Sequence, residues 1–240
     1  MKMQKAWLFL HLHCFNGKIG GWQGCLSLVV ARLPRKLTIF ADQTKNKNMI
    51  LPIVAYGHPV LRKVAEDITP DYPELKELIA NMWQTMYGSN GVGIAAPQVN
   101  KSIRLFVVDS EQIIQHLEEE EKNDYPGDNG VKEVFINAHI VETGGKEWAY
   151  NEGCLSIPKV REDVNRAETV TLSYVDENFT PHVKTFTGVT ARVILHEYDH
   201  IDGKLFIDHL KPLKRRMLKS KLDDITKGKI RVDYKMTFPK

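Results

Sequence analysis

The sequence predicts an α+β fold, in which antiparallel or mixed β-sheets pack around a central metal-binding HExxH helix and a further helix follows at the C-terminal end. Two observations support this class. Short stretches of alternating apolar and polar residues are separated by turn formers, which favours antiparallel strands. Strands and helices do not follow one another in the repeated βαβ order of a doubly wound sheet.

The composition is that of a globular protein. The chain has 240 residues, 42% hydrophobic and 26% charged, which suffices for one domain with a sizeable core. A net charge of +3 is too small by itself to indicate a nucleic-acid-binding protein, and no apolar run reaches the about 18 residues of a membrane-spanning helix. Three cysteines do not suggest a disulfide framework, so a reducing compartment is favoured. Neither DNA nor a membrane is expected as a partner.

Residues 1–48 differ in character from the rest of the chain. They contain no acidic residue before Asp42 and show no lasting periodicity. Targeting signals are weak, because there is no clean cleavage site for a secretory signal and serine is scarce for an organelle transit peptide. We interpret the segment as an extension, either a misassigned start before Met49 or a targeting leader. The folded domain is predicted at residues 49–240, in the cytoplasm, or in an organelle if residues 1–48 are a transit peptide.

The first elements of this domain follow from periodicity and turn formers. Residues 73–88 place apolar side chains at helical spacing, and residues 103–109 read as a short apolar strand. Residues 111–130 are acidic and end in turn formers, which predicts a surface insertion with one or two helical turns. Residues 133–142 are expected to form a strand that ends at Gly144 and Gly145.

The later elements are a hairpin and two helices. Residues 169–176 alternate apolar and polar side chains, residues 177–181 make a turn, and residues 182–188 return. A helix over 190–201 contains the stretch HEYDH, and residues 212–225 form an amphipathic basic helix. This order completes the predicted α+β domain.

The stretch HEYDH indicates a metal site. His196 and His200 are four residues apart, so on a helix they share one face and can bind one ion. The usual protease patterns do not supply a third ligand. A metzincin needs a third histidine at position 206, which is Phe206, and a thermolysin-like site needs a glutamate on a following helix, where only Asp223 and Asp224 occur.

Two further stretches offer candidate site residues. Cys154 lies in EGCLSIP, well inside the predicted domain; a lone cysteine is more often a core residue, but beside an unsatisfied histidine pair the ligand interpretation is favoured. In GVGIAAPQ, two glycines allow a backbone to approach a ligand, and the run ends in the amide of Gln98. Alone, this second stretch is equally consistent with a tight turn.

Taken together, GVGIAAPQ, EGCLS and HEYDH resemble, in that order, the three signature motifs of the peptide deformylases, and the EGCLSIP form resembles the bacterial type I branch. The resemblance extends from about residue 49 to about residue 219, and MILPIVAYGHPVLRKVA is similar to that family's N-terminal start. It implies a metal-dependent hydrolase that removes the N-terminal formyl group from formyl-methionine of nascent polypeptides and releases formate.

The resemblance also implies a role for each matching residue. The metal ligands would be Cys154, His196 and His200, with Fe2+ as the metal and Zn2+, Ni2+ or Co2+ able to replace it. Glu197 would be the general acid and base, and the Gln98 amide with the backbone N–H of Leu155 would form the oxyanion site. Gly93 would bind the substrate backbone, and Val92 and Val193 would line the pocket for the methionine side chain.

The sequence alone is also consistent with other functions for some of these residues. The HExxH stretch is also consistent with a zinc metallopeptidase that cuts internal bonds, or with a structural zinc module. Asp199 is expected either to orient a ligand or, more simply, to have a structural role. The basic C-terminal helix is usually only a solvated face, but the family resemblance and its charge also suggest ribosome binding.

Overall fold

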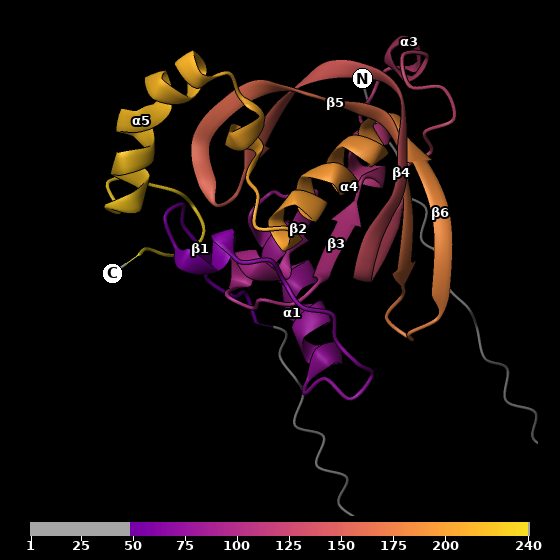
Figure 1. The fold of residues 1–240 in the computed structure, drawn as a ribbon, viewed down its shortest axis with the longest axis horizontal. Coiled ribbons are helices and arrows are strands. Elements are labelled where there is room, and N and C mark those ends of the chain that lie inside the picture. Colours follow the sequence, from indigo (N-terminus) through magenta and orange to yellow (C-terminus); the bar gives the residue numbers. More distant parts are fainter. Residues whose placement is uncertain (1–48, 240) are drawn as a thin grey trace, which may run out of the picture. The chain divides into compact units, whose positions relative to one another are not determined.

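A computed structural model describes residues 49–239 of the chain. The predictions made for residues 1–48 lie outside the described residues. The main feature is a five-stranded antiparallel sheet with the strand order β2-β3-β4-β5-β6. These strands span Gly93–Ala95 (β2), Leu105–Asp109 (β3), Lys132–Cys154 (β4), Ile157–Val175 (β5) and Pro181–Thr187 (β6). The predicted combination of an antiparallel sheet with separate helices is therefore confirmed (Figure 1).

The strands β4 and β5 are much longer than predicted. The expected strand end at Gly144 and Gly145 is wrong, because β4 continues through both glycines to Cys154. Likewise, the predicted strand over 169–176 is only the last part of β5. The β4–β5 pairing shifts register at four places, including the one between Gly144 and Glu147. Such irregularities bend a strand without ending it, and the two long strands curve over α4 in Figure 1.

The first predicted helix is confirmed as α1 (Leu75–Gly88). Its buried face includes Leu78, Met82 and Met86, which pack in one cluster with apolar residues of β2 and β3. GVGIAAPQ forms the short strand β2 and the 3₁₀ helix η2 (Ala96–Val99) instead of a simple turn. This arrangement places the end of GVGIAAPQ in the buried interior.

The acidic insertion has the predicted one or two helical turns, α2 (Glu111–Ile114) and α3 (Glu119–Lys122). Its end has an additional contact. Asp128 accepts hydrogen bonds from the backbone N–H and the hydroxyl of Thr190, in the first turn of α4 (Gly188–Ile201). The backbone of Gly188 has a φ of +59°, and a Cβ there would lie 2.9 Å from the Asp128 carboxylate. Glycine at this position therefore lets the insertion cap the helix.

The helix α4 carries HEYDH and covers the predicted helix 190–201. Its apolar side, including the fully buried Ile194 and Ile201, packs with Val170 and Leu172 of β5 and with residues of β3 and β4. The helix is enclosed on most sides, since even Glu197 and Asp199 are buried. The polar residues of α4 therefore depend on partners inside the protein.

The C-terminal part contains the 3₁₀ helix η3 (Phe206–His209) and the predicted basic helix, observed as α5 (Pro212–Thr226). The helix α5 buries only Leu218, Leu222 and Ile225. After it, β7 (Met236–Thr237) pairs in parallel with β1 (Ile53–Val54), and neither strand was predicted. A short 3₁₀ helix, η1 (Pro59–Arg62), follows β1.

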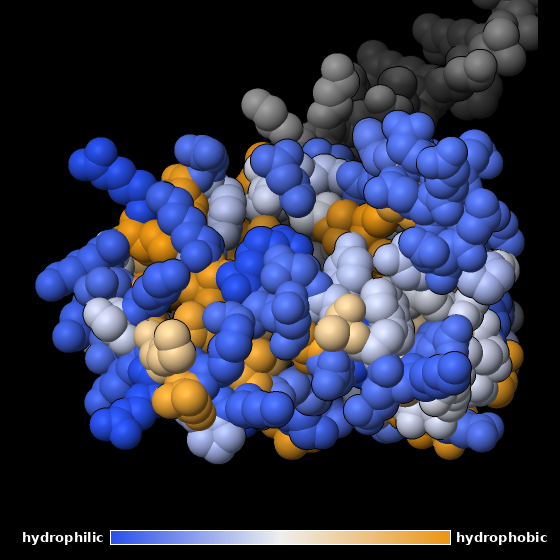
Figure 2. Space-filling model, turned by 90° about the horizontal axis from the view of Figure 1, so that it is seen from above, coloured by the Kyte–Doolittle hydropathy of each residue, from blue (hydrophilic) through white to orange (hydrophobic). Residues whose placement is uncertain are grey.

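The surface of this domain is mostly polar. In Figure 2, hydrophilic residues cover much of the face that is seen, and hydrophobic residues show between them in separate patches. Among residues 49–239, no helix is both long and apolar enough to cross a membrane.

Candidate metal centre

The three predicted metal ligands, Cys154, His196 and His200, lie close together. Cys154 is the last residue of β4, and His196 and His200 lie one turn apart on α4. Their ligand atoms all lie within 4.8 Å of one another, and the Cys154 Sγ is 3.2 Å from the His200 Nε2. The His196 Nδ1 is bound to Glu152, so the Nε2 of this ring is the nitrogen left for an ion. The helix supplies two ligands by its periodicity, and the end of the strand supplies the third.

The protonation of the cysteine suits a metal ligand. Burial alone would raise the pKa of the Cys154 thiol, but the charge of His200 and hydrogen bonds from both histidines lower it to about 5. The side chain is therefore a thiolate at neutral pH, which is the form that binds metals. Two imidazoles and one thiolate are donors that suit Fe2+, Zn2+ and similar divalent ions. These residues fit such an ion.

Glu197 lies beside this centre on α4 and is 4% exposed. Burial raises the pKa of its carboxyl group to about 7, and the Oε2 atom has no hydrogen-bond partner among the described residues. A carboxyl group with this pKa can accept and return a proton at neutral pH. The side chain fits there because position 93 is glycine: a Cβ on Gly93 would lie 2.6 Å from the Glu197 Oε1.

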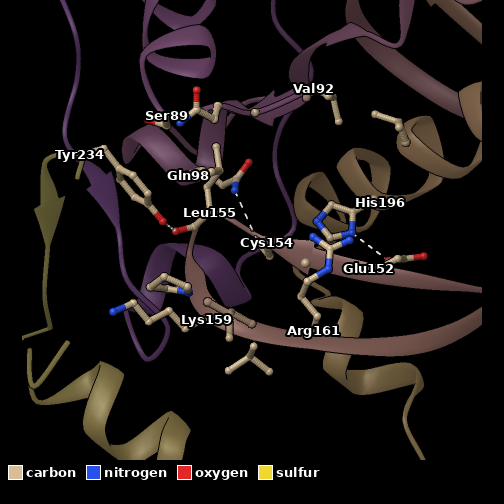
Figure 3. A pocket seen from close by; sticks show the side chains of 18 of the residues that line it. Ser89, Val92, Gln98, Glu152, Cys154, Leu155, Lys159, Arg161, His196 and Tyr234 are labelled. Carbon is tan, nitrogen blue, oxygen red and sulfur yellow. Dashed lines mark hydrogen bonds and ion pairs between the residues drawn. The ribbon is translucent and has the colours of Figure 1, made fainter. Parts of the chain in front are cut away.

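Gln98 faces the same centre from η2. Its Oε1 accepts a hydrogen bond of 2.8 Å from the N–H of Ala95, which fixes the amide group. Its Nε2 then points toward the end of β4, 3.6 Å from the Cys154 Sγ and 3.4 Å from the Ser156 hydroxyl (Figure 3). The amide donor is thus held at the centre by the turn of its own 3₁₀ helix.

The structure places the predicted site residues around one cavity of about 710 Å³. Those that line it are Val92, Gly93, Gln98, Cys154, Leu155, Val193, His196 and Glu197. The remaining one, His200, does not line the cavity and is almost fully buried. Segments far apart in the sequence therefore converge on one site. Phe206, at the position of a metzincin's third histidine, is instead a core residue whose ring lies 6.0 Å from the His196 ring.

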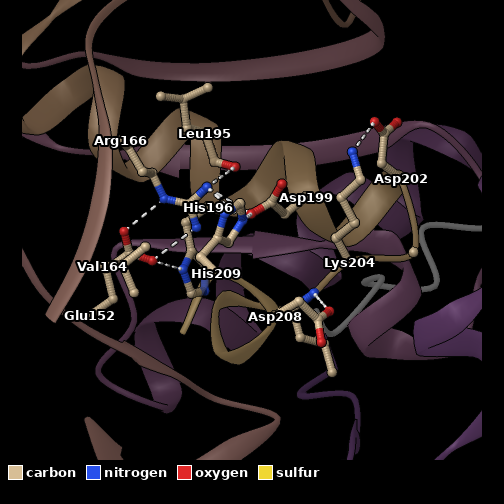
Figure 4. A network of polar contacts seen from close by, with 12 residues as sticks. Glu152, Val164, Arg166, Leu195, His196, Asp199, Asp202, Lys204, Asp208 and His209 are labelled. Atoms are coloured by element: carbon tan, nitrogen blue, oxygen red, sulfur yellow. Dashed lines mark hydrogen bonds and ion pairs between the residues drawn. The ribbon is translucent and has the colours of Figure 1, made fainter. Parts of the chain in front are cut away.

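A buried charge network beside the ligands was not predicted (Figure 4). Glu152 binds the His196 Nδ1 at 2.9 Å and also accepts hydrogen bonds from Arg166 and Arg192. These contacts lower the pKa of Glu152 although its burial opposes this, so it remains a carboxylate. A carboxylate bound to Nδ1 fixes the tautomer of a histidine ligand. The sequence signal was present, since Glu152 begins EGCLS, but its partners are distant in the chain.

Asp199 belongs to the same network. Its Oδ2 accepts a hydrogen bond of 2.7 Å from Arg166 and lies 2.7 Å from the His209 Nε2. It makes no hydrogen bond to His196 or His200, and it is linked to them through Arg166, which also binds Glu152. This agrees with the expected structural role.

Comparisons with known proteins identify similar chains. The model of the family described as "Polypeptide deformylase" matches residues 50–216. A peptide deformylase of Christiangramia forsetii is 55% identical over 193 residues, which cover 80% of this chain and 97% of that relative. A peptide deformylase of Chlorobaculum parvum is 42% identical over 186 residues, covering 78% and 93% of the two chains.

Solved structures show the same similarity. The crystal structure of a peptide deformylase from Legionella pneumophila has a TM-score of 0.63 and 38% identity, and the match covers 76% of this chain and 98% of that one. A peptide deformylase of Plasmodium falciparum has a TM-score of 0.63 and 34% identity, over 73% and 95% of the two chains.

Proposed function

This chain belongs to the peptide deformylase family and is a hydrolase that removes the N-terminal formyl group from nascent polypeptides; on this premise we propose that Cys154, His196 and His200 hold its metal ion and that Glu197 transfers the proton. The convergence of the three ligand atoms beside a buried carboxyl group carries the proposal. When bound, a divalent ion at these ligands supplies Lewis-acid activation of water and of the formyl carbonyl.

The proton transfers are assigned to Glu197. Its carboxylate takes a proton from the attacking water, and the formyl carbon–nitrogen bond then breaks as the same proton passes to the leaving amine. Formate and a free amino terminus are the products. The raised pKa supports both steps, because a group that titrates near 7 releases a proton as readily as it accepts one.

The carbonyl oxygen gains negative charge during attack, and two donors are assigned to it. The Gln98 Nε2 is fixed by the bond from Ala95 to the other atom of its amide, and the Leu155 N–H follows directly after the cysteine ligand. Donors held in advance stabilise such a charge, and the loss of one commonly lowers the rate by about 10²–10³-fold. Gly93 is assigned to the substrate backbone, and Val92 and Val193 to the methionine side chain, because all three line the cavity.

The metal is proposed to be Fe2+, with Zn2+, Ni2+ or Co2+ able to replace it. A thiolate and two imidazoles bind each of these ions, and both Fe2+ and a thiolate are open to oxidation. The iron form is therefore expected to lose activity in air faster than a nickel form. Parallel time courses of the two forms in air test this, and equal decay would rule out the expected difference.

The central experiment measures formate release from a formyl-Met peptide by anaerobically prepared, metal-loaded protein. The parent is expected to release formate and the Glu197→Ala variant almost none, with an equal metal content in both. The same peptide without its formyl group is the control substrate. No formate from a folded, metal-loaded parent would contradict the proposal, and cleavage of the control substrate would favour a metallopeptidase.

The two zinc alternatives have less support. A closed structural site needs four protein ligands, whereas the cluster found among residues 49–239 has three, Cys154, His196 and His200. A metzincin-type peptidase needs a histidine at the position of Phe206. Deformylation therefore remains the function that the site supports best.

We further propose that α5 binds the ribosome. Its basic residues are Lys211 just before the helix and Lys214, Arg215, Arg216, Lys219 and Lys221 within it, and all are exposed. Leu213 and Met217, one turn apart on the same helix, are 71% and 73% exposed. Basic side chains bind RNA phosphates in a salt-dependent way. Co-sedimentation with ribosomes that does not fall with rising salt, or is unchanged after substitution of these basic residues, would contradict this role.

We also propose the limits of the catalytic domain and the location of the protein. Residues 49–240 are assigned to the catalytic domain and residues 1–48 to an extension, with a cytoplasmic location, or an organelle if the extension is a transit peptide. Protein sequencing of the mature N-terminus, together with fluorescence microscopy of the tagged full chain, tests both assignments.

A further inference from the structure

The segment after α5 returns to the cavity. β7 is held beside β1 by hydrogen bonds from the Ile53 N–H to the Lys235 carbonyl and from the Ala55 N–H to the Thr237 carbonyl. This pairing brings residues 231–234 against the cavity, which they help to line. The segment lies beyond residues 50–216, which the family model matches. It therefore adds a wall to the cavity that the three signature motifs do not supply.

Tyr234 of this segment is hydrogen-bonded to the residue that follows the cysteine ligand. Its hydroxyl donates a hydrogen bond of 2.8 Å to the carbonyl of Leu155 (Figure 3). Burial, with a smaller contribution from Cys154, raises the pKa of Tyr234, so the hydroxyl keeps its proton throughout the range of an assay. Its ring packs against the cluster that contains α1 and β3.

The bond from Tyr234 acts on a part of the chain that the sheet does not fix. Leu155 and Ser156 form the turn between β4 and β5, and the last paired residues are Cys154 and Ile157. The Ser156 carbonyl accepts a hydrogen bond of 2.8 Å from the Tyr56 N–H, near β1. The two carbonyls of the turn are thus held by groups from the two chain segments that form the small parallel sheet.

We propose that Tyr234 is a positioning residue, whose hydroxyl fixes the Leu155 residue so that its N–H stays directed at the carbonyl oxygen of the formyl group. This inference rests on the role proposed above for the Leu155 N–H. The Leu155 N–H and carbonyl lie in consecutive peptide planes that share the Leu155 Cα, so the N–H keeps one direction only if both planes are held. Cys154, which shares the plane of the N–H, is paired with Ile157, and Tyr234 holds the plane of the carbonyl. Fixing the carbonyl therefore restricts the donor, and donors that need no reorganisation stabilise a transition state best.

The Tyr234→Phe variant tests this, because it removes the hydroxyl and keeps the ring. One hydrogen bond contributes about 0.5–1.5 kcal/mol net, which corresponds to roughly a 2–10-fold fall in kcat. KM for a formyl-Met peptide is expected to stay within about twofold, because the donor acts on charge that develops during the reaction. The pH profile is expected to keep its midpoint. Rates are expressed per bound metal ion.

Two comparison variants separate the possible outcomes. Tyr174→Phe removes a hydroxyl bonded to Glu133, away from the cavity, and is expected to lower the melting temperature without changing kcat. Gln98→Ala tests the oxyanion site itself. A Tyr234→Phe kcat equal to that of the parent within error, a change confined to KM, or a loss of metal content instead of kcat would each overturn the inference.

The activities of the parent, Gln98→Ala and Tyr234→Phe together show whether the proposed function or only the role of Tyr234 is wrong. If the metal-loaded parent releases no formate, the function assigned to the site is wrong. If the parent is active and Gln98→Ala is strongly impaired while Tyr234→Phe equals the parent, only the positioning role of Tyr234 is wrong.

Discussion

The contact between Gly93 and Glu197 leads to a sharp prediction for Gly93→Ala. A Cβ at position 93 would lie 2.6 Å from the Glu197 Oε1, 2.8 Å from Cγ and 2.9 Å from Cδ, whereas ordinary contacts begin at 3.4 Å. The carboxyl group or β2 must therefore move by as much as 0.8 Å. A displacement near 1 Å in a catalytic group lowers the rate by about 10²-fold. We expect kcat to fall by about that factor, or ~2.7 kcal/mol, with the metal content unchanged.

The assay is formate release per bound metal ion, with the melting temperature measured in parallel. Gly144→Ala is the matched control, because a Cβ there meets only the Thr169 hydroxyl, at 3.1 Å, and the residue does not line the cavity. The control is expected to keep the parent kcat. A metal-loaded Gly93→Ala variant with parent activity would refute the reasoning.

A double-mutant cycle identifies the cause of the loss. In a Glu197→Ala background the side chain that clashes is absent, so adding Gly93→Ala is expected to lower the residual rate no further. If Gly93→Ala still costs its full factor in that background, the loss comes from the contact of position 93 with the substrate backbone and not from displacement of Glu197.

Three further predictions follow from the polar contacts. Glu152→Gln removes one of the two buried carboxylates that pair with Arg166 and weakens the hold on His196. We therefore expect a loss of about 3 kcal/mol in urea unfolding and a 10–100-fold weaker metal affinity in a competition titration. In metal-free protein, burial raises the pKa of Glu197 in the folded state from its ordinary value of 4.5 to about 7. The stability is therefore full below pH 4.5 and is lost as the pH rises through 7. Glu197→Gln is expected to raise the unfolding free energy by about 3 kcal/mol at pH 8 and hardly at pH 4, and equal shifts at both would contradict this. Asp128→Ala removes the cap of α4 at Thr190 and is expected to cost about 1–2 kcal/mol in thermal unfolding, a result within error of the parent being the contrary outcome.

The local features of this fold could be predicted from the sequence. The helix with HEYDH and the hairpin around residues 177–181 were found because period and turn residues act within a few positions. The length of β4 was not found, because Gly144 and Gly145 resemble a strand end, while the structure uses the same region for a register shift.

Part of the candidate site could also be predicted, because its metal ligands lie in short local motifs. Cys154, His196 and His200 lie in recognisable motifs, and the structure brings them together. The partners of Glu152 could not be found, because Arg166 and Arg192 are ordinary charged residues in the sequence and only the fold shows that they are buried. The pairing of β1 with β7 joins two-residue strands from opposite ends of the domain, and so short a segment has no measurable pattern.

The small parallel sheet of β1 and β7 is expected to open before the rest of the folded domain. β1 and β7 each contain two residues, so few backbone hydrogen bonds hold the C-terminal segment in place. Amide hydrogen exchange in native proteins is fastest where a cooperative unit is small, and slowest in the core. The amides of Ile53 and Ala55 are therefore expected to exchange well before those of β3. Each such opening separates Tyr234 from Leu155 while the sheet and α4 stay intact, so the active site has a lower local stability than the domain that carries it.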